Sequence, residues 1–94
     1  MISTLLALAS SVVVQPLATD HYRLTIYFSS TGVSDQAEAQ FALADAAKRL
    51  CKGKGQATSE GALELNEVPK TDVVNRKKGR LSLTEEWRCV SPTP

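Results

Sequence analysis

Hydrophobic and polar side chains alternate over residues 21–29, and this alternation predicts a strand with one covered face. The apolar set consists of Tyr22, Leu24, Ile26 and Phe28. Successive side chains of a strand point to opposite faces of a sheet, so this set is predicted to lie in the core. The sequence Ser-Thr-Gly at residues 30–32 breaks the pattern and ends the strand.

Residues 35–51 have the three- and four-residue spacing of apolar positions that is typical of an amphipathic helix. The predicted buried stripe contains Ala37, Phe41, Ala44, Ala47, Leu50 and Cys51, and Leu43 widens it. Ser34 is predicted to cap the N-terminus, where the charge of Asp35 also complements the helix dipole. Gly53 or Gly55 is expected to end the helix with a positive φ angle.

A second extended segment, residues 62–68, places Leu63 and Leu65 on one face. Residues 75–79 are predicted to form a basic turn, because they combine Asn, Gly and three cationic side chains. Residues 71–74, which lie between the two, either extend the second strand or form a short strand of their own.

The last strand is predicted at residues 80–90. Its apolar set is Leu81, Leu83, Trp87 and Cys89. Glu85 falls in phase with that set, so either the chain bulges at residues 85–86 or the end of the strand leaves the core there. On the other strand faces, Glu64 or Glu67 is expected to pair across the sheet with Arg80 or Arg88.

The order strand, helix, strand, strand predicts an α+β fold. In this two-layer sandwich one helix packs on a small, mainly antiparallel sheet of three strands, or four if a short segment joins it. The other face of the sheet is open to solvent.

The first 18 residues contain no charged side chain and carry a Leu-Ala-Val-rich run. This pattern predicts a signal peptide cleaved after Ala18, which leaves residues 19–94 as a single small domain with a frayed tail at residues 91–94. The run is too short and too often interrupted by polar residues to span a bilayer. Two alternatives remain open: cleavage after the A-x-A pattern of Ala7 and Ala9, and a strand over residues 11–17.

The two cysteines are predicted to form a disulfide. Cys51 ends the helix stripe and Cys89 lies on the inward face of the last strand, so both thiols point into the layer between helix and sheet. The alternative is a pair of free, buried cysteines in a cytosolic protein. The predicted leader favours the disulfide and an exported protein, periplasmic or secreted. In this plan, carried by the leader, Cys51 and Cys89, the chain resembles small cysteine-paired periplasmic proteins of Gram-negative bacteria.

Composition and charge narrow the function classes. With 43% hydrophobic and 22% charged residues, the chain is expected to fold as a globular domain. Eleven Lys and Arg against ten Asp and Glu give a net charge of +1, far from the strongly basic character of a dedicated nucleic-acid binder. Specific nucleic-acid binding is therefore not expected.

The residues do not predict catalysis, a metal site or a cofactor. His21 is the only histidine and lies at the start of the predicted mature chain, which is a poor position for a catalytic imidazole. One histidine and two isolated cysteines do not provide the ligands of a metal or redox motif. The glutamates at positions 60, 64, 67, 85 and 86 are explained as solvated strand faces, because two short strands form no deep cleft.

Two surfaces are candidates for binding. Arg76, Lys77, Lys78 and Arg80 form the most concentrated basic patch, which suits an anionic surface; the alternative is a solubilising turn that blocks strand-to-strand aggregation. The second surface is the open sheet face around Arg23, Thr25 and Tyr27.

The first functional hypothesis is a non-enzymatic, exported binding or accessory module, whose partner is a protein or an anionic envelope component. The second is an inhibitor or immunity-type partner of a secreted hydrolase. An unpaired edge strand would also allow a dimer by strand addition.

Overall fold

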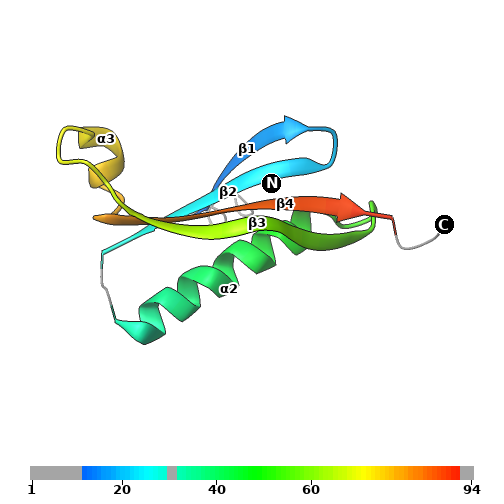
Figure 1. Ribbon diagram of the computed structural model, residues 1–94, viewed down its shortest axis with the longest axis horizontal. Coiled ribbons are helices and arrows are strands. Elements are labelled where there is room, and N and C mark those ends of the chain that lie inside the picture. Colours follow the sequence, from blue (N-terminus) through cyan, green and yellow to red (C-terminus); the bar gives the residue numbers. More distant parts are fainter. Residues whose placement is uncertain (1–11, 30–31, 92–94) are drawn as a thin grey trace, which may run out of the picture.

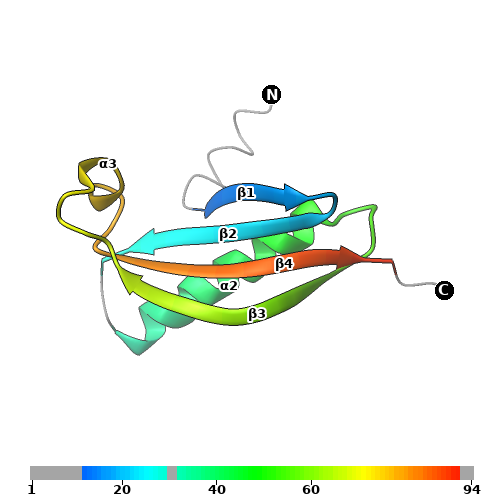
Figure 2. The same ribbon diagram turned by 45° about the horizontal axis from the view of Figure 1, so that its top comes forward.

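The computed structural model describes residues 12–29 and 32–91 of the chain. The elements are β1 (Val12–Ala18), β2 (His21–Phe28), α2 (Val33–Leu50), β3 (Gln56–Glu67), α3 (Val73–Arg76) and β4 (Leu81–Val90). The four strands form one antiparallel sheet in the order β1-β2-β4-β3. The long helix α2 runs along one face of this sheet (Figure 1), and β1 and β3 are its two edges (Figure 2). The α+β class and the long helix on an antiparallel sheet are as predicted.

The predicted element order lacks the first strand. Residues 12–18 form β1, which was the alternative to a leader at these positions, and β1 pairs with β2 through Val12 opposite Ile26. Val12 is only 8% exposed and belongs to the core, whereas the rest of β1 is exposed. The fourth strand of the sheet is thus this N-terminal segment. Residues 1–11 of the predicted leader and residues 92–94 of the predicted tail lie outside the described residues.

The segment at residues 71–74 is not a strand. It enters the short helix α3, whose N-terminus is capped by the Asp72 side chain accepting a hydrogen bond from the Asn75 backbone N–H at 3.3 Å. Arg76 anchors this helix to the end of β3, because its Nη1 donates to the carbonyl oxygen of Val68 at 2.6 Å. Local capping by Asp72 therefore favours a helical turn here over the strand that was predicted.

The buried stripe of α2 matches the predicted one in part: Leu43, Ala47 and Cys51 are buried as predicted, whereas Ala37 and Phe41 are exposed. Ala39 is also buried, and Phe41 is 76% exposed. Leu43 and Leu24 of β2 are both fully buried in the same core cluster. Alanines lie on every side of this helix, so the spacing of apolar positions is compatible with more than one buried stripe. Packing against the sheet buries the stripe that contains Leu43.

The helix also begins earlier than predicted. Its N-cap is Gly32, whose carbonyl accepts a hydrogen bond from the Gln36 N–H at 3.1 Å, and which has no side chain of its own to cap the helix. Ser34 is therefore a residue of the first turn and not the cap. At the other end, Gly53 and Gly55 both have positive φ angles, as expected for the turn after the helix. A Cβ atom at Gly55 would collide with the backbone of Val90.

The irregularity expected in the last strand occurs in its partner. β4 pairs with β2 without interruption, and Glu85 lies opposite Leu24. The register shift is in β3, between Glu60 and Glu64, where Gly61 has a φ of +82°. This bulge stands opposite Glu85, and β3 begins at Gln56 instead of residue 62.

The bulge also changes the predicted cross-strand ion pair. Arg88 Nε lies 3.0 Å from Glu60 Oε2, so neither Glu64 nor Glu67 is its partner. The two side chains are both part-exposed, and such a pair contributes little to stability by itself. The contact does hold the Glu60 carboxylate next to Arg88, just before the bulge.

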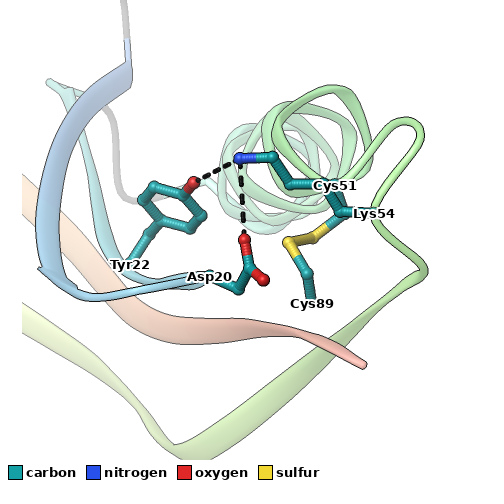
Figure 3. Close-up of a disulfide and its surroundings, with 5 residues drawn as sticks. All are labelled: Asp20, Tyr22, Cys51, Lys54 and Cys89. Atoms are coloured by element: carbon teal, nitrogen blue, oxygen red, sulfur yellow. Dashed lines mark hydrogen bonds and ion pairs between the residues drawn. A yellow bond between two sulfur atoms is a disulfide. The ribbon is translucent and has the colours of Figure 1, made fainter. Parts of the chain in front are cut away.

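The predicted disulfide between Cys51 and Cys89 is present, with a Cα–Cα distance of 5.2 Å and a sequence separation of 38 (Figure 3). Cys51 is the C-cap residue of α2, and its N–H donates to the carbonyl oxygen of Ala47 at 3.0 Å. Cys89 is near the end of β4. The bond therefore joins the C-terminal end of the helix to the last strand of the sheet, and both cysteines are buried.

Polar contacts reinforce this end of the domain (Figure 3). Lys54 Nζ donates to the Tyr22 hydroxyl at 3.3 Å and lies 3.6 Å from Asp20 Oδ1. The hydrogen bond to Tyr22, with a smaller contribution from Asp20, raises the pKa of Lys54 above its ordinary value. Asp20 itself is in the β1–β2 turn with a φ of 57°, and its carbonyl accepts from the Cys89 N–H at 2.9 Å. The loop after α2, the first turn and the end of β4 are thus connected.

Replacing both cysteines, C51A with C89A, should lower the free energy of unfolding by about 4 kcal/mol. The disulfide closes a long loop, and its loss restores conformational entropy to the unfolded chain. Chemical denaturation of the oxidised parent and the double variant measures the difference, and the reduced parent should match the variant. A loss below about 1 kcal/mol would show that the bond adds little to this fold.

Leu43→Ala should destabilise the domain by about 2–5 kcal/mol, because it leaves a cavity at a fully buried position. Phe41→Ala should change stability by less than about 0.5 kcal/mol, because the ring is mostly exposed. Urea denaturation with the disulfide intact compares the two variants. If Phe41→Ala proved the more damaging substitution, the helix would have to be rotated relative to the sheet.

Candidate functional site

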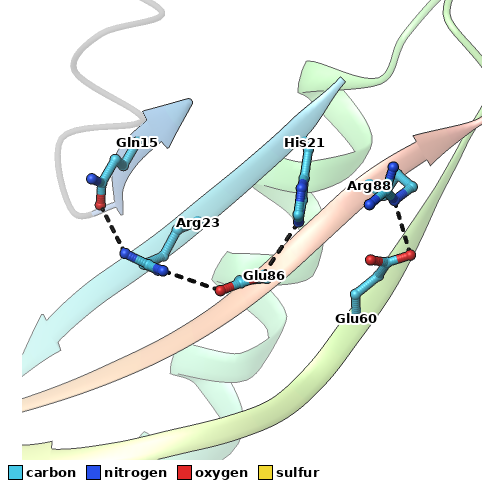
Figure 4. Close-up of polar contacts among 6 residues, drawn as sticks. All are labelled: Gln15, His21, Arg23, Glu60, Glu86 and Arg88. Atoms are coloured by element: carbon cyan, nitrogen blue, oxygen red, sulfur yellow. Dashed lines mark hydrogen bonds and ion pairs between the residues drawn. The ribbon is translucent and has the colours of Figure 1, made fainter. Parts of the chain in front are cut away.

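The sheet face opposite α2 carries a network of polar side chains (Figure 4). Arg23 is at its centre: Nη2 donates to Glu86 Oε2 at 3.2 Å, and Nη1 lies 3.5 Å from Gln15 Oε1. Thr25 and Thr84 share a hydrogen bond of 3.0 Å between their hydroxyl oxygens. The predicted binding residues Arg23 and Thr25 are therefore on the open face, as expected, but their polar groups are already engaged within the sheet.

His21 belongs to the same network. Its Nε2 lies 3.3 Å from Glu86 Oε1, close enough for an ion pair when the imidazole is protonated but without hydrogen-bond geometry. Glu86 is thus placed between His21 and Arg23 (Figure 4). His21 and Arg23 belong to β2, and Glu86 belongs to the neighbouring strand β4. The register between these strands explains the arrangement, because it places His21 opposite Arg88 and Arg23 opposite Glu86.

Tyr27 connects the open face to the basic segment. Lys78 Nζ is 5.6 Å from the centroid of the Tyr27 ring, within the range of a cation–π contact. Tyr27 is the second-to-last residue of β2, and Lys78 is just beyond α3, so the two candidate surfaces meet at this point. We call the exposed cations Lys77, Lys78 and Arg80, together with Tyr27, the basic surface.

The cations of the basic surface have no acidic partner. Among the described residues, no carboxylate lies within ion-pair distance of Lys77, Lys78 or Arg80. Arg76 has a different role, because its guanidinium donates to the Val68 carbonyl and thereby holds α3 against the end of β3. Of the seven predicted residues, the structure brings Lys78 to Tyr27, and Lys77 and Arg80 flank Lys78 along the chain. Arg23, Thr25 and Arg76 make internal contacts instead.

Two surface hollows were missed by the sequence reasoning. One, of about 370 Å³, lies at the β3 bulge and is lined by Arg23, Glu60, Gly61, Ala62, Glu64, Thr84, Glu85 and Glu86. The other, of about 320 Å³, lies between α2 and β4 and is lined by Ala37, Gln40, Phe41, Ala44, Glu85 and Trp87. Glu85, a charge in phase with an apolar set, was the only sequence signal for these hollows. The bulge and the orientation of the helix depend on tertiary contacts, so the sequence pattern did not predict them.

Within residues 12–29 and 32–91, no cluster of three or more His, Cys, Asp or Glu side chains is arranged to hold a metal ion. The same part of the chain has no helix with the length and apolarity needed to cross a bilayer.

Comparison of the chain with protein-family models, with curated proteins and with solved structures finds no significant match.

Proposed function

We propose that this chain is an exported, non-enzymatic binding module, stabilised by one disulfide, that attaches through its basic surface to an anionic component of the cell envelope. The observation that carries the proposal is the position of Lys78 over Tyr27. This contact joins the cationic segment to the sheet face, so that charge and an aromatic side chain are presented together.

The distribution of charge supports an anionic partner. The net charge of the chain is only +1, yet Lys77, Lys78 and Arg80 are exposed and have no carboxylate of the described residues within ion-pair distance. Elsewhere on the sheet face the charges are balanced internally, as in the pairs of Arg23 with Glu86 and of Arg88 with Glu60. Unbalanced cations on a rigid support attract anionic surfaces over about a Debye length.

The cysteine pair supports export. A disulfide is consistent with an oxidising compartment, since cytosolic thiols are kept reduced in most organisms. Together with the uncharged N-terminal segment, it favours the periplasm or the extracellular space as the location of the domain.

The proposal also includes a dimer, formed when an edge strand of one copy pairs with an edge strand of another. The two edges of the sheet differ: β3 carries Glu60, Glu64 and Glu67 and a bulge, which are features that protect an edge, whereas β1 has no charged residue. Pairing through β1 is therefore favoured over pairing through β3, but only along residues 12–15, because Pro16 and the register shift between Pro16 and Ala18 interrupt the rest of β1. This dimer requires a mature chain that keeps β1.

The double variant K77E with K78E should bind anionic vesicles about 30-fold or more weakly than the parent. Each lysine close to an anionic membrane surface contributes about 1 kcal/mol, and the substitution also introduces repulsion. Co-sedimentation with vesicles of phosphatidylglycerol and phosphatidylcholine measures the affinity, and raising the salt concentration should weaken it.

The matched control is K48E with K52E, which changes the net charge equally at exposed positions near the end of α2. Equal losses in both double variants would mean that total charge, and not the basic surface, determines binding. Absence of binding to anionic vesicles, together with recovery of one stoichiometric hydrolase from envelope extract, would instead favour the inhibitor hypothesis.

Export also predicts the state of the N-terminus. Protein recovered from its native source should lack the leader and should have a mass about 2 Da below that of its reduced form. Cleavage after Ala18 gives Thr19 as the first residue and removes β1, whereas cleavage after Ala9 gives Ser10 and keeps this strand in the sheet. Intact mass spectrometry reads both properties at once. A chain that starts at Met1 with both sulfurs reduced would contradict export.

A further inference from the structure

We propose that the hollow between α2 and β4 is a second binding site, which receives an organic cation of the alkylammonium type. The three residues that would recognise it are Phe41, Glu85 and Trp87. The inference does not depend on the basic surface, since it concerns other residues and a ligand of opposite charge.

Glu85 is the origin of the argument. Its side chain is partly buried and lies in β4 between Leu83 and Trp87, on the apolar side of the strand. Among the described residues, no cation lies within ion-pair distance of its carboxylate. Removing a carboxylate from water without a compensating cation costs free energy, so a cationic ligand at this position would be stabilised.

Trp87 holds the carboxylate in place and leaves part of it available. The indole Nε1 donates to Glu85 Oε1 at 3.1 Å, which orients both side chains. Within the described chain, Oε2 has no hydrogen-bond donor. One carboxylate oxygen therefore fixes the aromatic ring, and the other is free to accept from an ammonium group.

The second aromatic residue comes from the helix. Phe41 is 76% exposed and lines the same hollow as Trp87. Aromatic faces attract organic cations through their quadrupole and also contact the alkyl groups that surround the charge. An exposed phenylalanine beside a partly buried tryptophan and a carboxylate is thus complementary to an alkylammonium ion, which combines a charge with an apolar surface.

The helix provides space for the ligand. The residues of α2 that line the hollow are Ala37, the adjacent pair Gln40 and Phe41, and Ala44. Ala37 and Ala44 each lie three or four residues from that pair, so the four share one face of the helix. Ala37 and Ala44 are small, and the resulting volume of about 320 Å³ is at the lower end of the range of small-molecule sites. The hollow is large enough for a small ammonium ligand or the end of a lysine side chain.

Trp87 is the only tryptophan of the chain, so its fluorescence reports directly on the hollow. We would titrate the full chain, with its disulfide intact, with tetramethylammonium and with n-butylammonium, at matched ionic strength. The first probe represents a quaternary ammonium ligand and the second a lysine side chain. The neutral analogue 3,3-dimethyl-1-butanol tests whether charge is required.

Saturable changes with either ammonium probe, and none with the neutral analogue, are expected. Glu85→Gln should weaken the interaction about tenfold, because it removes the charge but keeps an oxygen that can accept from Trp87 Nε1. The matched control Glu67→Gln removes an exposed carboxylate that does not line the hollow, and it should leave the affinity unchanged.

Phe41→Ala is a second test, which does not rely on Glu85→Gln folding correctly. It removes one aromatic wall at an exposed position and should weaken binding several-fold while leaving stability almost unchanged. The proposal is overturned if neither ammonium ion binds, if the neutral analogue binds equally well, or if both hollow variants retain the affinity of the parent.

Discussion

The disulfide between Cys51 and Cys89 is the constraint on which the arrangement of this small domain depends. It joins the cap residue of α2 to the last strand, while Leu43 packs into the same core as Leu24. A domain of this size buries a limited fraction of its surface, so a covalent connection between its two layers has a large effect on stability. Cys51 attaches the end of the helix to the sheet, and Leu43 attaches its middle. The helical periodicity then determines which way the other side chains of α2 point.

That attachment explains why the surface has two regions of different chemistry. The helical stripe that contains Phe41 is turned away from the core and lies beside β4, where Glu85 and Trp87 are exposed to the same hollow. On the opposite face of the sheet, cross-strand pairs such as Arg23 with Glu86 neutralise most charges. Near α3, Lys77, Lys78 and Arg80 have no carboxylate of the described residues within ion-pair distance, and Lys78 lies over the Tyr27 ring.

The β3 edge of the sheet is irregular. β3 combines a bulge at residues 61–63 with glutamates before and after it, and these features interrupt the regular row of hydrogen-bonding groups that another strand would need. The same bulge opens the space beside Glu85. One local irregularity therefore both protects an edge and shapes the hollow that Gly61 and Ala62 line.

The sequence alone determined the elements whose signal is local. The alternation around Leu24 and Ile26 defined β2, the glycines at positions 53 and 55 defined the end of α2, and the two cysteines on inward-facing positions defined the disulfide. It also singled out Tyr27 and Lys78, although it did not bring them together. These features were predictable because each depends on the periodicity or conformational preference of a short segment.

Only the tertiary structure decided which alanine-rich stripe of α2 faces the sheet, that residues 12–18 pair with β2, and that the bulge belongs to β3 instead of β4. Phe41 was predicted to be buried and lies outside the core, because Leu43 fills the space opposite Leu24. The physical reason is common to all three: alanine and short apolar runs satisfy several local patterns equally well, and the choice between them depends on packing against residues distant in the sequence.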